Sequence, residues 1–531
     1  MRTEPVPSAS FVDTGPTQVV RARGWVRSLG WELPLIVFLA LVAFAAHAFN
    51  MYSFPGFRED EGVYAAQAWS VLRDQSLTPY TYTYDHAPAG WLLGALWMLV
   101  TGGPETFGGA LLSGRVLILI LHVTSAVMLY RIARKLGCGP IASAVATLLF
   151  SVSPLAVPFQ RLFILDNIMI FWLLLSLNLL LDGWGRLSRL VLSGITFGIA
   201  VLTKETAIFL IPAFLYVSVQ QRWRHQGRFA VGGWLVPFLA IVSLYLLYAA
   251  LKGELLPAGN ALGSVALSGA PGEASLFDAL RWQLGRDGDG ILDLGGQLWS
   301  TIRGSWMPRD AVFLMAGTGA ILVNLIRGIR DRHALTIALL GLMPIVYLVR
   351  GGVVFDFYIL FALPFLALNV GWLLSKVTPI RPATVVPVIL FAGAVGIAAG
   401  YSDPYQAPAA YTERPGEAHR HAAEWVKQNV PADSFIIATD SYWADLREPG
   451  MGGPEFPNVH SHWKVGADPQ VRDDVFNNDP SNVDYLLITP STKETFRTTD
   501  NEFALDALDR SSLVRSWESE GSRVELWRTD D

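Results

Sequence analysis

Blocks of apolar residues recur along most of this chain, and each is close to the length of a membrane-spanning helix. A bilayer core takes about 20 apolar residues per helical span, and shorter spans fit by tilting or by burial among neighbours. Only 16% of the residues are charged, whereas a soluble domain is nearer a quarter. The blocks predict a polytopic α-helical membrane protein with about eleven transmembrane helices, at residues 31–49, 109–130, 140–157, 167–182, 189–203, 206–219, 229–250, 311–326, 334–349, 358–374 and 383–400.

Basic residues lie in alternate short loops between these blocks and predict the orientation of the chain. Cytoplasmic loops of membrane proteins carry an excess of Lys and Arg. We therefore expect a plasma-membrane protein with a cytoplasmic N-terminus, and with its C-terminal region and the other loops outside. The basic clusters are Arg21/Arg23/Arg27, Arg131/Arg134/Lys135, Arg186/Arg189, Arg222/Arg224/Arg228, Arg327/Arg330/Arg332 and Lys376/Arg381.

The same pattern predicts three regions. Residues 1–30 form a cytoplasmic tail, and residues 31–400 form a transmembrane domain with outward loops at 50–108 and 251–310. Residues 401–531 have soluble composition and alternate helix and strand patterns, which predict a small extracytoplasmic α/β domain. Its expected elements are a helix at about 416–429, strands in SFIIATD and VDYLLIT, a helix near 501–509 and strands near 512–517 and 522–528. Two further amphipathic stretches, 62–73 and 88–101, predict interfacial helices on the outer membrane surface.

Charged residues gather at the predicted outer ends of the spans, where charge is costly and usually marks a pathway or a site. Glu59, Asp60 and Glu61 directly follow an apolar block. A helix start alone would explain them, because acidic residues complement the helix dipole and cap free N–H groups. Other outward loops, however, also carry charges tight against apolar runs. We therefore expect one shared cavity, with contributions from Arg161, Asp166, Lys204, Glu205, Arg350, Asp356 and Tyr358.

An outward-facing enzyme has no access to nucleotide sugars and must draw an activated group from the lipid. A polyprenyl-phosphate sugar meets this need, because the phosphate is the leaving group and the prenyl tail stays in the bilayer. The reaction needs a carboxylate that takes the proton of an acceptor hydroxyl, and cations that hold the phosphate. The candidate carboxylates are Asp60, Glu61 and Asp166, and the candidate cations are Lys204, Arg350, Arg161 and His86.

The order of these motifs resembles the GT-C superfamily of membrane glycosyltransferases, most closely the branch with protein O-mannosyltransferases and the aminoarabinose transferase of lipid A. The resemblance covers about residues 30–400 and departs from relatives at His86, where they often have Lys. It implies an inverting glycosyltransferase that moves a hexosyl or pentosyl group from a polyprenyl-phosphate donor to a lipid, glycan or protein hydroxyl of the cell envelope. The matching points are Asp60–Glu61 followed by Tyr64 and Ala65, Asp85–His86–Ala87–Pro88, Arg161 and Asp166, Thr203–Lys204–Glu205, and Tyr358 with Leu363–Pro364.

The resemblance also implies roles, each with a structural alternative. Asp60 is the general base, and Glu61, about 100° away on a helix, binds a metal or caps the helix. Asp166 orients sugar or metal, or forms an ion pair with Arg161. Lys204 and Arg350 contact phosphate or snorkel to the interface.

Three further assignments concern the donor and the cofactor. Tyr358 bonds to the donor or is an interfacial aromatic residue, and Asp356 is a candidate partner of Arg350. A divalent metal ion is the candidate cofactor, with Glu61 and His86 as candidate ligands. His460 and His462 lack the ligand spacing of a structural zinc site.

A transporter or flippase for a lipid-linked or envelope glycan is the alternative function. It would predict inverted repeats and charged or broken helices at the membrane midplane. The sequence shows no such repeat, and its charges gather at one face. We expect no nucleic-acid partner.

Overall fold

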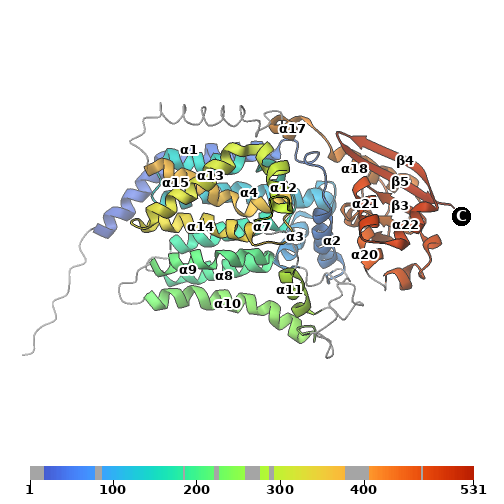
Figure 1. The fold of residues 1–531 in the computed structure, drawn as a ribbon, viewed down its shortest axis with the longest axis horizontal. Coiled ribbons are helices and arrows are strands. Elements are labelled where there is room, and N and C mark those ends of the chain that lie inside the picture. The colour runs from blue at the N-terminus through green and yellow to red at the C-terminus, as the bar shows by residue number, and fades with distance from the viewer. Residues whose placement is uncertain are drawn as a thin grey trace, which may run out of the picture.

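A bundle of helices with a small α/β domain at one end forms the molecule (Figure 1). The structure is a computed structural model, and it describes residues 17–77, 86–182, 186–220, 227–256, 275–285, 292–376, 406–467 and 471–530. Backbone N–H and C=O groups have no partners in a hydrocarbon core, so helices that satisfy these groups internally are the expected solution. The predicted fold class is therefore confirmed.

The bundle helices coincide with the predicted apolar blocks, except for the block at 383–400, which lies outside the described residues. α1 begins at Thr17, so the predicted tail 1–30 contains the first part of a helix. Within the described residues, five helical stretches are long and apolar enough to cross a membrane: Ala110–Lys135, Phe229–Leu251, Gln297–Gly328, Arg332–Val349 and Asp356–Lys376. The bundle consists of α1 (Thr17–Ala48), α4 (Ala110–Lys135), α5 (Pro140–Val152), α7 (Leu165–Leu181), α8 (Leu187–Thr203), η3 (Glu205–Leu210), α9 (Ile211–Gln220), α10 (Gly227–Leu251), α12 (Gln297–Thr301), η4 (Ile302–Trp306), α13 (Met307–Gly328), α14 (Arg332–Val349), η5 (Asp356–Phe361) and α15 (Leu363–Lys376).

Small residues bring the bundle helices close together. A Cβ atom at Gly194 of α8 would lie 2.2 Å from the carbonyl oxygen of Trp234 in α10, and one at Gly198 would lie 2.7 Å from Ile241. Such close approach supports van der Waals packing, the main attraction between helices in lipid. α10 is only 17% buried in its most apolar window, so its outer face is available to lipid.

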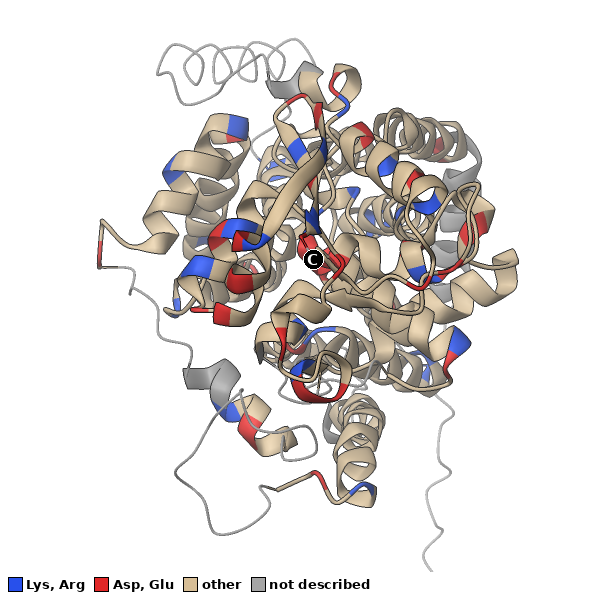
Figure 2. Cartoon of the chain, turned by 90° about the vertical axis from the view of Figure 1, so that its right-hand side faces the viewer, with Lys and Arg blue, Asp and Glu red and all other residues tan. Residues whose placement is uncertain are grey.

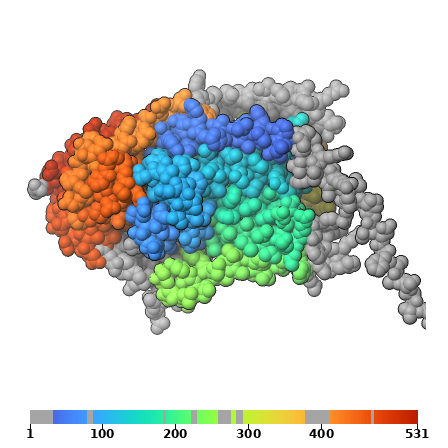
Figure 3. All heavy atoms as spheres, turned by 180° about the vertical axis from the view of Figure 1, so that it is seen from behind, coloured from blue at the N-terminus to red at the C-terminus, as the bar shows by residue number. Residues whose placement is uncertain are grey.

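Two short helices lie between the bundle and the α/β domain, as Figures 1 and 3 show. α2 (Glu59–Arg73) and α3 (Ala89–Thr101) correspond to the predicted interfacial helices. α3 exposes Leu92, Leu96, Leu99 and Val100 on one side, as an interfacial helix should. α2 is different, because most of its residues from Glu61 to Ser70 are buried by protein on both sides. The C-terminal domain, which the apolar pattern could not place, covers it.

The C-terminal domain is built on a five-stranded sheet in the order β2-β1-β3-β5-β4. The three short strands pair in parallel, with Ile436 opposite both Val459 and Tyr485, and the last two strands add an antiparallel hairpin. The sequence predicted all of these strands except β2. The elements are α17 (Gln406–Thr412), α18 (Gly416–Asn429), β1 (Ile436–Ala438), α19 (Asp440–Arg447), β2 (Val459–Ser461), α20 (His462–Ala467), β3 (Tyr485–Ile488), α21 (Pro490–Thr498), α22 (Glu502–Asp509), β4 (Ser511–Ser519) and β5 (Ser522–Thr529).

Helix α19 docks the C-terminal domain along α2. Near the start of α2, the backbone of Asp440 and Ser441 lies so close to Gly62 that a Cβ atom there would be 2.3 Å from it. Near the end of α2, the buried Glu448 carboxylate accepts hydrogen bonds from Trp69 and Arg73. The C-terminal domain therefore contacts α2 near both ends of the helix. Seen from this end, charged residues are spread over the domain, while the bundle helices behind it carry few (Figure 2).

The domain also caps α4. The Asp445 carboxylate accepts a hydrogen bond of 2.6 Å from the Ala110 N–H, the first residue of α4, where free N–H groups favour an acceptor. Burial nevertheless raises the pKa of Asp445 to about 7, because the desolvation of its charged form outweighs these hydrogen bonds.

Substitution of Gly62 by Ala should weaken this docking. The added methyl group must push α19 away from α2, and overpacking of this kind costs on the order of 1–3 kcal/mol. Gly319→Ala in α13 is the matched control, since nothing lies within 4 Å of its Cβ position. We expect a lower Tm and faster hydrogen exchange across residues 416–530 in Gly62→Ala only. Equal behaviour of the two variants would contradict this account of the interface.

The raised pKa of Asp445 predicts how stability depends on pH. Between its ordinary value of 3.8 and about 7, the folded protein holds a proton that the unfolded chain has released. Stability from this group therefore falls as pH rises through that window. Asp445→Asn should remove the dependence. We expect the Tm of the native chain to fall from pH 5 to pH 7.5 by more than that of the variant, in parallel thermal melts.

Candidate functional site

Asp60 lies in the first turn of α2. Asp60 and Tyr64 are four residues apart and so share a face, and the ring of Tyr64 lies 6.1 Å from the ring of His86. Asp60 is half-buried. Asp85 lies outside the described residues. Glu61 also stabilises the N-terminus of α2, because its carboxylate accepts a hydrogen bond from the Arg58 N–H in a capping box.

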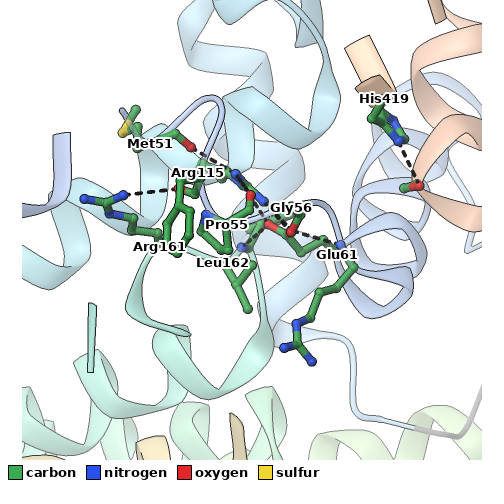
Figure 4. A network of polar contacts seen from close by, with 12 residues as sticks. Met51, Pro55, Gly56, Glu61, Arg115, Arg161, Leu162 and His419 are labelled. Carbon is green, nitrogen blue, oxygen red and sulfur yellow. Dashed lines mark hydrogen bonds and ion pairs between the residues drawn. The ribbon is translucent and has the colours of Figure 1, made fainter. Parts of the chain in front are cut away.

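Glu61 points away from Asp60 into a fully buried ion pair with Arg115 of α4 (Figure 4). Arg115 donates to both carboxylate oxygens at 3.0 and 2.7 Å, and the Phe163 N–H donates to the same carboxylate at 2.8 Å. Arg115 also donates to the carbonyls of Met51 and Pro55. This carboxylate therefore has structural partners, and we assign it neither metal binding nor catalysis. Arg115 is an arginine inside the apolar block 109–130, and a charge in such a block indicates that a buried counterion is present elsewhere in the chain.

Lys204 and Asp166 form the second buried pair, with 2.6 Å between the Lys204 Nζ and the Asp166 Oδ2. Asp166 stands in the first turn of α7, where the helix dipole favours a carboxylate. Lys204 follows the last residue of α8. Its ammonium group lies 4.8 Å from the ring centroid of Tyr358 and 5.4 Å from that of Phe357. Asp166, Lys204 and Tyr358 are thus brought together.

Arg161 lies elsewhere, and the predicted alternative of an Arg161–Asp166 ion pair is wrong. The Arg161 guanidinium, between α6 (Val157–Gln160) and α7, donates to the carbonyls of Ala46, Ala410 and Phe54, and Asp166 pairs with Lys204 instead. The separation of five residues along the sequence did not indicate which groups Arg161 and Asp166 contact. Arg161 thus ties α1, α17 and the loop before α2 together, away from Lys204.

His86 pairs with Glu205, the residue next to Lys204. The His86 Nδ1 lies 2.9 Å from the Glu205 carboxylate, and the Ala87 N–H donates to the other carboxylate oxygen at 2.8 Å. The hydroxyl of Tyr245 in α10 donates to the His86 carbonyl at 3.3 Å. This contact fixes the segment before α3 against η3. It holds His86 on Glu205, the residue after Lys204, with the Tyr64 ring of α2 6.1 Å away.

Arg350 joins the same region through an aromatic residue that the sequence reasoning missed. Its guanidinium lies 4.2 Å from the ring centroid of Tyr347, and that ring lies 5.9 Å from the ring of Tyr358. Tyr347 is buried, so Arg350, Tyr347, Tyr358 and Lys204 form a continuous layer of cations and rings. Cation–π contacts of this kind hold guanidinium groups in place while leaving N–H donors for a ligand.

Asp356 does not pair with Arg350 as predicted. It forms a bidentate ion pair with Arg58, at 2.9 and 2.8 Å, and thereby ties η5 to the start of α2. The indole N–H of Trp306 donates to the Asp356 carbonyl at 2.6 Å. Arg58 was not singled out in the sequence, although it stands next to the acidic triplet. η5 turns the Asp356 side chain toward α2 while Tyr358 faces Lys204.

In the described part of the chain, no group of three or more His, Cys, Asp or Glu side chains is placed to hold a metal ion. Glu61 and His86, the predicted metal candidates, have the partners named above. His460 and His462 lie in the C-terminal domain, where burial lowers the pKa of each to about 4.

The fold defines the class of this protein. It resembles the crystal structure of ArnT from Cupriavidus metallidurans in the apo state, with a TM-score of 0.59 at 14% identity over 94% of this chain and 98% of that one. The form bound to undecaprenyl phosphate gives 0.55 at 14% identity over the same shares. An oligosaccharyltransferase of Archaeoglobus fulgidus gives 0.54 at 13% identity, over 96% of this chain and 75% of that one. The chain is thus a polytopic membrane protein with the GT-C fold.

The sequence narrows this class further. Residues 85–248 match the family of dolichyl-phosphate-mannose-protein mannosyltransferases. A stretch of 137 residues is 31% identical to undecaprenyl phosphate-alpha-4-amino-4-deoxy-L-arabinose arabinosyl transferases of Pseudomonas aeruginosa, covering 24% of this chain and 25% of theirs. The matched stretch thus spans about a quarter of those relatives. Over the stretches that they cover, both matches are to enzymes whose names give a lipid-phosphate-linked sugar as the donor, in agreement with the resemblance of the motifs.

The buried Glu61–Arg115 pair predicts a large loss of stability when one partner is removed. Glu61→Gln leaves the Arg115 charge buried without its counterion, which costs about 3–5 kcal/mol. Glu61→Leu combined with Arg115→Met should recover part of that loss, because it leaves no buried charge. Thermal unfolding in detergent measures both. A Glu61→Gln protein with native Tm would show that the pair has no structural weight.

Proposed function

We propose that this protein transfers a sugar from a polyprenyl-phosphate donor to an acceptor hydroxyl, with Asp60 as the general base. The proposal is supported by the position of Asp60 in the first turn of α2, one helical turn before Tyr64, whose ring lies 6.1 Å from that of His86. A half-buried carboxylate next to a cluster of cations and aromatic rings suits a reaction in which a hydroxyl loses a proton while a phosphate gains charge.

In the proposed step, the Asp60 carboxylate takes the proton of the acceptor hydroxyl. The hydroxyl oxygen attacks the anomeric carbon of the sugar, and a new glycosidic C–O bond forms. The bond between that carbon and the phosphate oxygen breaks, and its electron pair leaves with the polyprenyl phosphate. Attack from the face opposite the phosphate inverts the anomeric configuration. The proton stays on Asp60 until the products leave.

The cations have separate tasks in this mechanism. Lys204 stabilises the charge that develops on the leaving phosphate, and Asp166 keeps its ammonium group charged and fixed when no phosphate is bound. Arg350, held by the Tyr347 ring, supplies further donors to the phosphate oxygens, and the Tyr358 hydroxyl supplies another. His86 is held by Glu205 at the place where relatives often carry Lys. We assign it to orienting the donor phosphate.

The orientation follows from the same chemistry. We propose that the end of the bundle that carries the C-terminal domain faces outward from the plasma membrane and that the N-terminus is cytoplasmic. The positive charges of the alternate loops support this. Lipid, envelope glycan or secreted protein supplies the acceptor.

Replacement of Asp60 by Asn tests the proposal directly. Loss of the general base should lower transfer by about 10²–10⁴-fold, with Tm unchanged. Asp74→Asn at the exposed C-terminal end of the same helix is the matched control and should transfer at the native rate. The donor is first identified by mass spectrometry of lipids that copurify with the full chain. Its turnover in proteoliposomes is then followed as release of polyprenyl phosphate.

Two outcomes would contradict the proposal. Native turnover in the Asp60→Asn protein would exclude this residue as the base. Movement of the lipid-linked sugar across the vesicle membrane, without release of polyprenyl phosphate, would instead establish the flippase alternative.

A further inference from the structure

A cleft lies beside Arg58, the residue that pairs with Asp356 of η5. It is a cleft of about 410 Å³ between the start of α2, α6, the start of α13 and α17. Arg58 and Arg309 line it from two sides, with the Phe159 ring between them at 5.8 Å from the Arg58 guanidinium and 5.2 Å from that of Arg309. None of the residues assigned to sugar transfer lines this cleft.

The charges in the cleft are unbalanced. Arg58 is neutralised by its bidentate pair with Asp356. Arg309 donates to Ser305, in η4 directly before its own helix, and lies over the Phe159 ring. The Asp356 carboxylate that pairs with Arg58 also attracts Arg309, but across the described ranges no carboxylate lies within 4.0 Å of the Arg309 guanidinium. The remaining carboxylate of the lining, Glu413, is exposed. Two guanidinium groups, Arg58 and Arg309, therefore share the single Asp356 carboxylate. The half-buried Arg309 keeps donors for an anion, and its planar fork of N–H groups matches phosphate.

An apolar groove of about 750 Å³ lies next to this cleft. It runs along the C-terminal part of α1, over Val42, Phe44, Ala45 and Phe49, and is closed by Tyr411 of α17. Phe44 and Phe49 are 51% and 61% exposed, and the rest of this α1 face is apolar as well. Val42 to Phe49 spans about 11 Å of helix, which suits a segment of an acyl chain in the bilayer.

Arg161 shows that the groove and the cleft are neighbours. One guanidinium donates to the carbonyl of Ala46 in the groove wall at 2.7 Å and to the carbonyl of Phe54 in the cleft wall at 3.3 Å. It donates as well to Ala410 of α17 at 2.8 Å. The two hollows therefore flank the same short helix, α17, which leads into the C-terminal domain.

We propose that the cleft and the groove together bind an anionic membrane phospholipid, separate from the polyprenyl-phosphate donor. The head-group phosphate lies on Arg309 beside the Arg58–Asp356 pair, and one acyl chain lies along α1. The occupant is a phospholipid because the cleft holds two guanidinium groups that share one carboxylate, and a short apolar groove lies next to it. Such a lipid would fasten α17, and with it the C-terminal domain, to the bundle. This site does not depend on the proposed transferase activity.

Native mass spectrometry of the full chain in detergent tests the head-group contact. The protein is titrated with phosphatidylglycerol or with phosphatidylcholine. We expect phosphatidylglycerol adducts to weaken about tenfold in Arg309→Gln, the loss typical of one charge-assisted hydrogen bond. Arg309→Lys should retain most of the binding. The matched control is Arg303→Gln, an exposed guanidinium in the preceding helical turn, which should bind as the native chain does.

The groove is tested by a variant that leaves the cations intact. Ala45→Trp fills the groove from the exposed face of α1, so long-chain phosphatidylglycerol should lose affinity while a short-chain analogue should not. This variant also keeps the proposal testable should Arg309→Gln fail to fold.

Three results would overturn the proposal. In the first, the native chain, Arg309→Gln and Ala45→Trp all bind phosphatidylglycerol equally well. In the second, millimolar inorganic phosphate alone displaces the lipid. In the third, equimolar polyprenyl phosphate displaces the lipid from the native chain, and Arg309→Gln abolishes this competition. The first denies the site, the second makes the ligand a free anion, and the third makes the cleft part of the donor site. Loss of transferase activity in Asp60→Asn with phosphatidylglycerol binding retained would keep the two proposals distinct.

Discussion

The buried ion pair between Glu61 and Arg115 is the contact on which the position of α2 depends. Both side chains are fully buried, and a charge at such depth is tolerated only when its partner and its hydrogen bonds are in place. The pair meets this condition with donors from α4 and from the Phe163 N–H, close to the start of α7. It therefore fixes the first turn of α2 in rotation as well as in position. Asp60, one residue earlier, therefore lies on another face of α2, the one that also carries Tyr64.

Two further contacts complete this placement from other parts of the chain. The Arg58–Asp356 pair brings η5 to the start of α2, and Gly62 admits the backbone of α19. Transmembrane helices and the C-terminal domain thus meet on one short helix. The C-terminal domain is for this reason part of the scaffold of the site, and Glu448 at the far end of α2 gives it a second hold.

Most of the charges near the site have a defined partner, which separates structural from chemical tasks. Arg161 donates to backbone carbonyls, and Glu61 accepts from Arg115 and from backbone N–H groups, so both side chains stabilise the scaffold. Lys204, Asp166, Arg350 and Tyr358 lie together on the other face of η5. η5 thus lies between two clusters of charges, because Tyr358 contacts Lys204 and Asp356 pairs with Arg58. The Lys204 cluster suits the proposed transfer, and the cleft lined by Arg58 and Arg309 suits an anionic head group.

The sequence by itself determined the helical membrane class, the span positions and most of the C-terminal sheet. Long apolar blocks and alternating strand patterns are local signals. They predict membrane-spanning helices and strands directly, because a bilayer core needs a set length of apolar residues and a strand has a period of two. It also marked Asp60, Asp166, Lys204, Arg350 and Tyr358 as residues at the same end of the bundle. β2 was missed because a three-residue strand carries no period.

Only the tertiary structure decided which charge pairs with which. The partners of Glu61, Asp166 and Asp356 lie on other elements, far away in sequence, so spacing along the chain could not identify them. Burial then forces each charge to find a counterion or a carbonyl, and the packing of α2, α7 and η5 settles which one it finds.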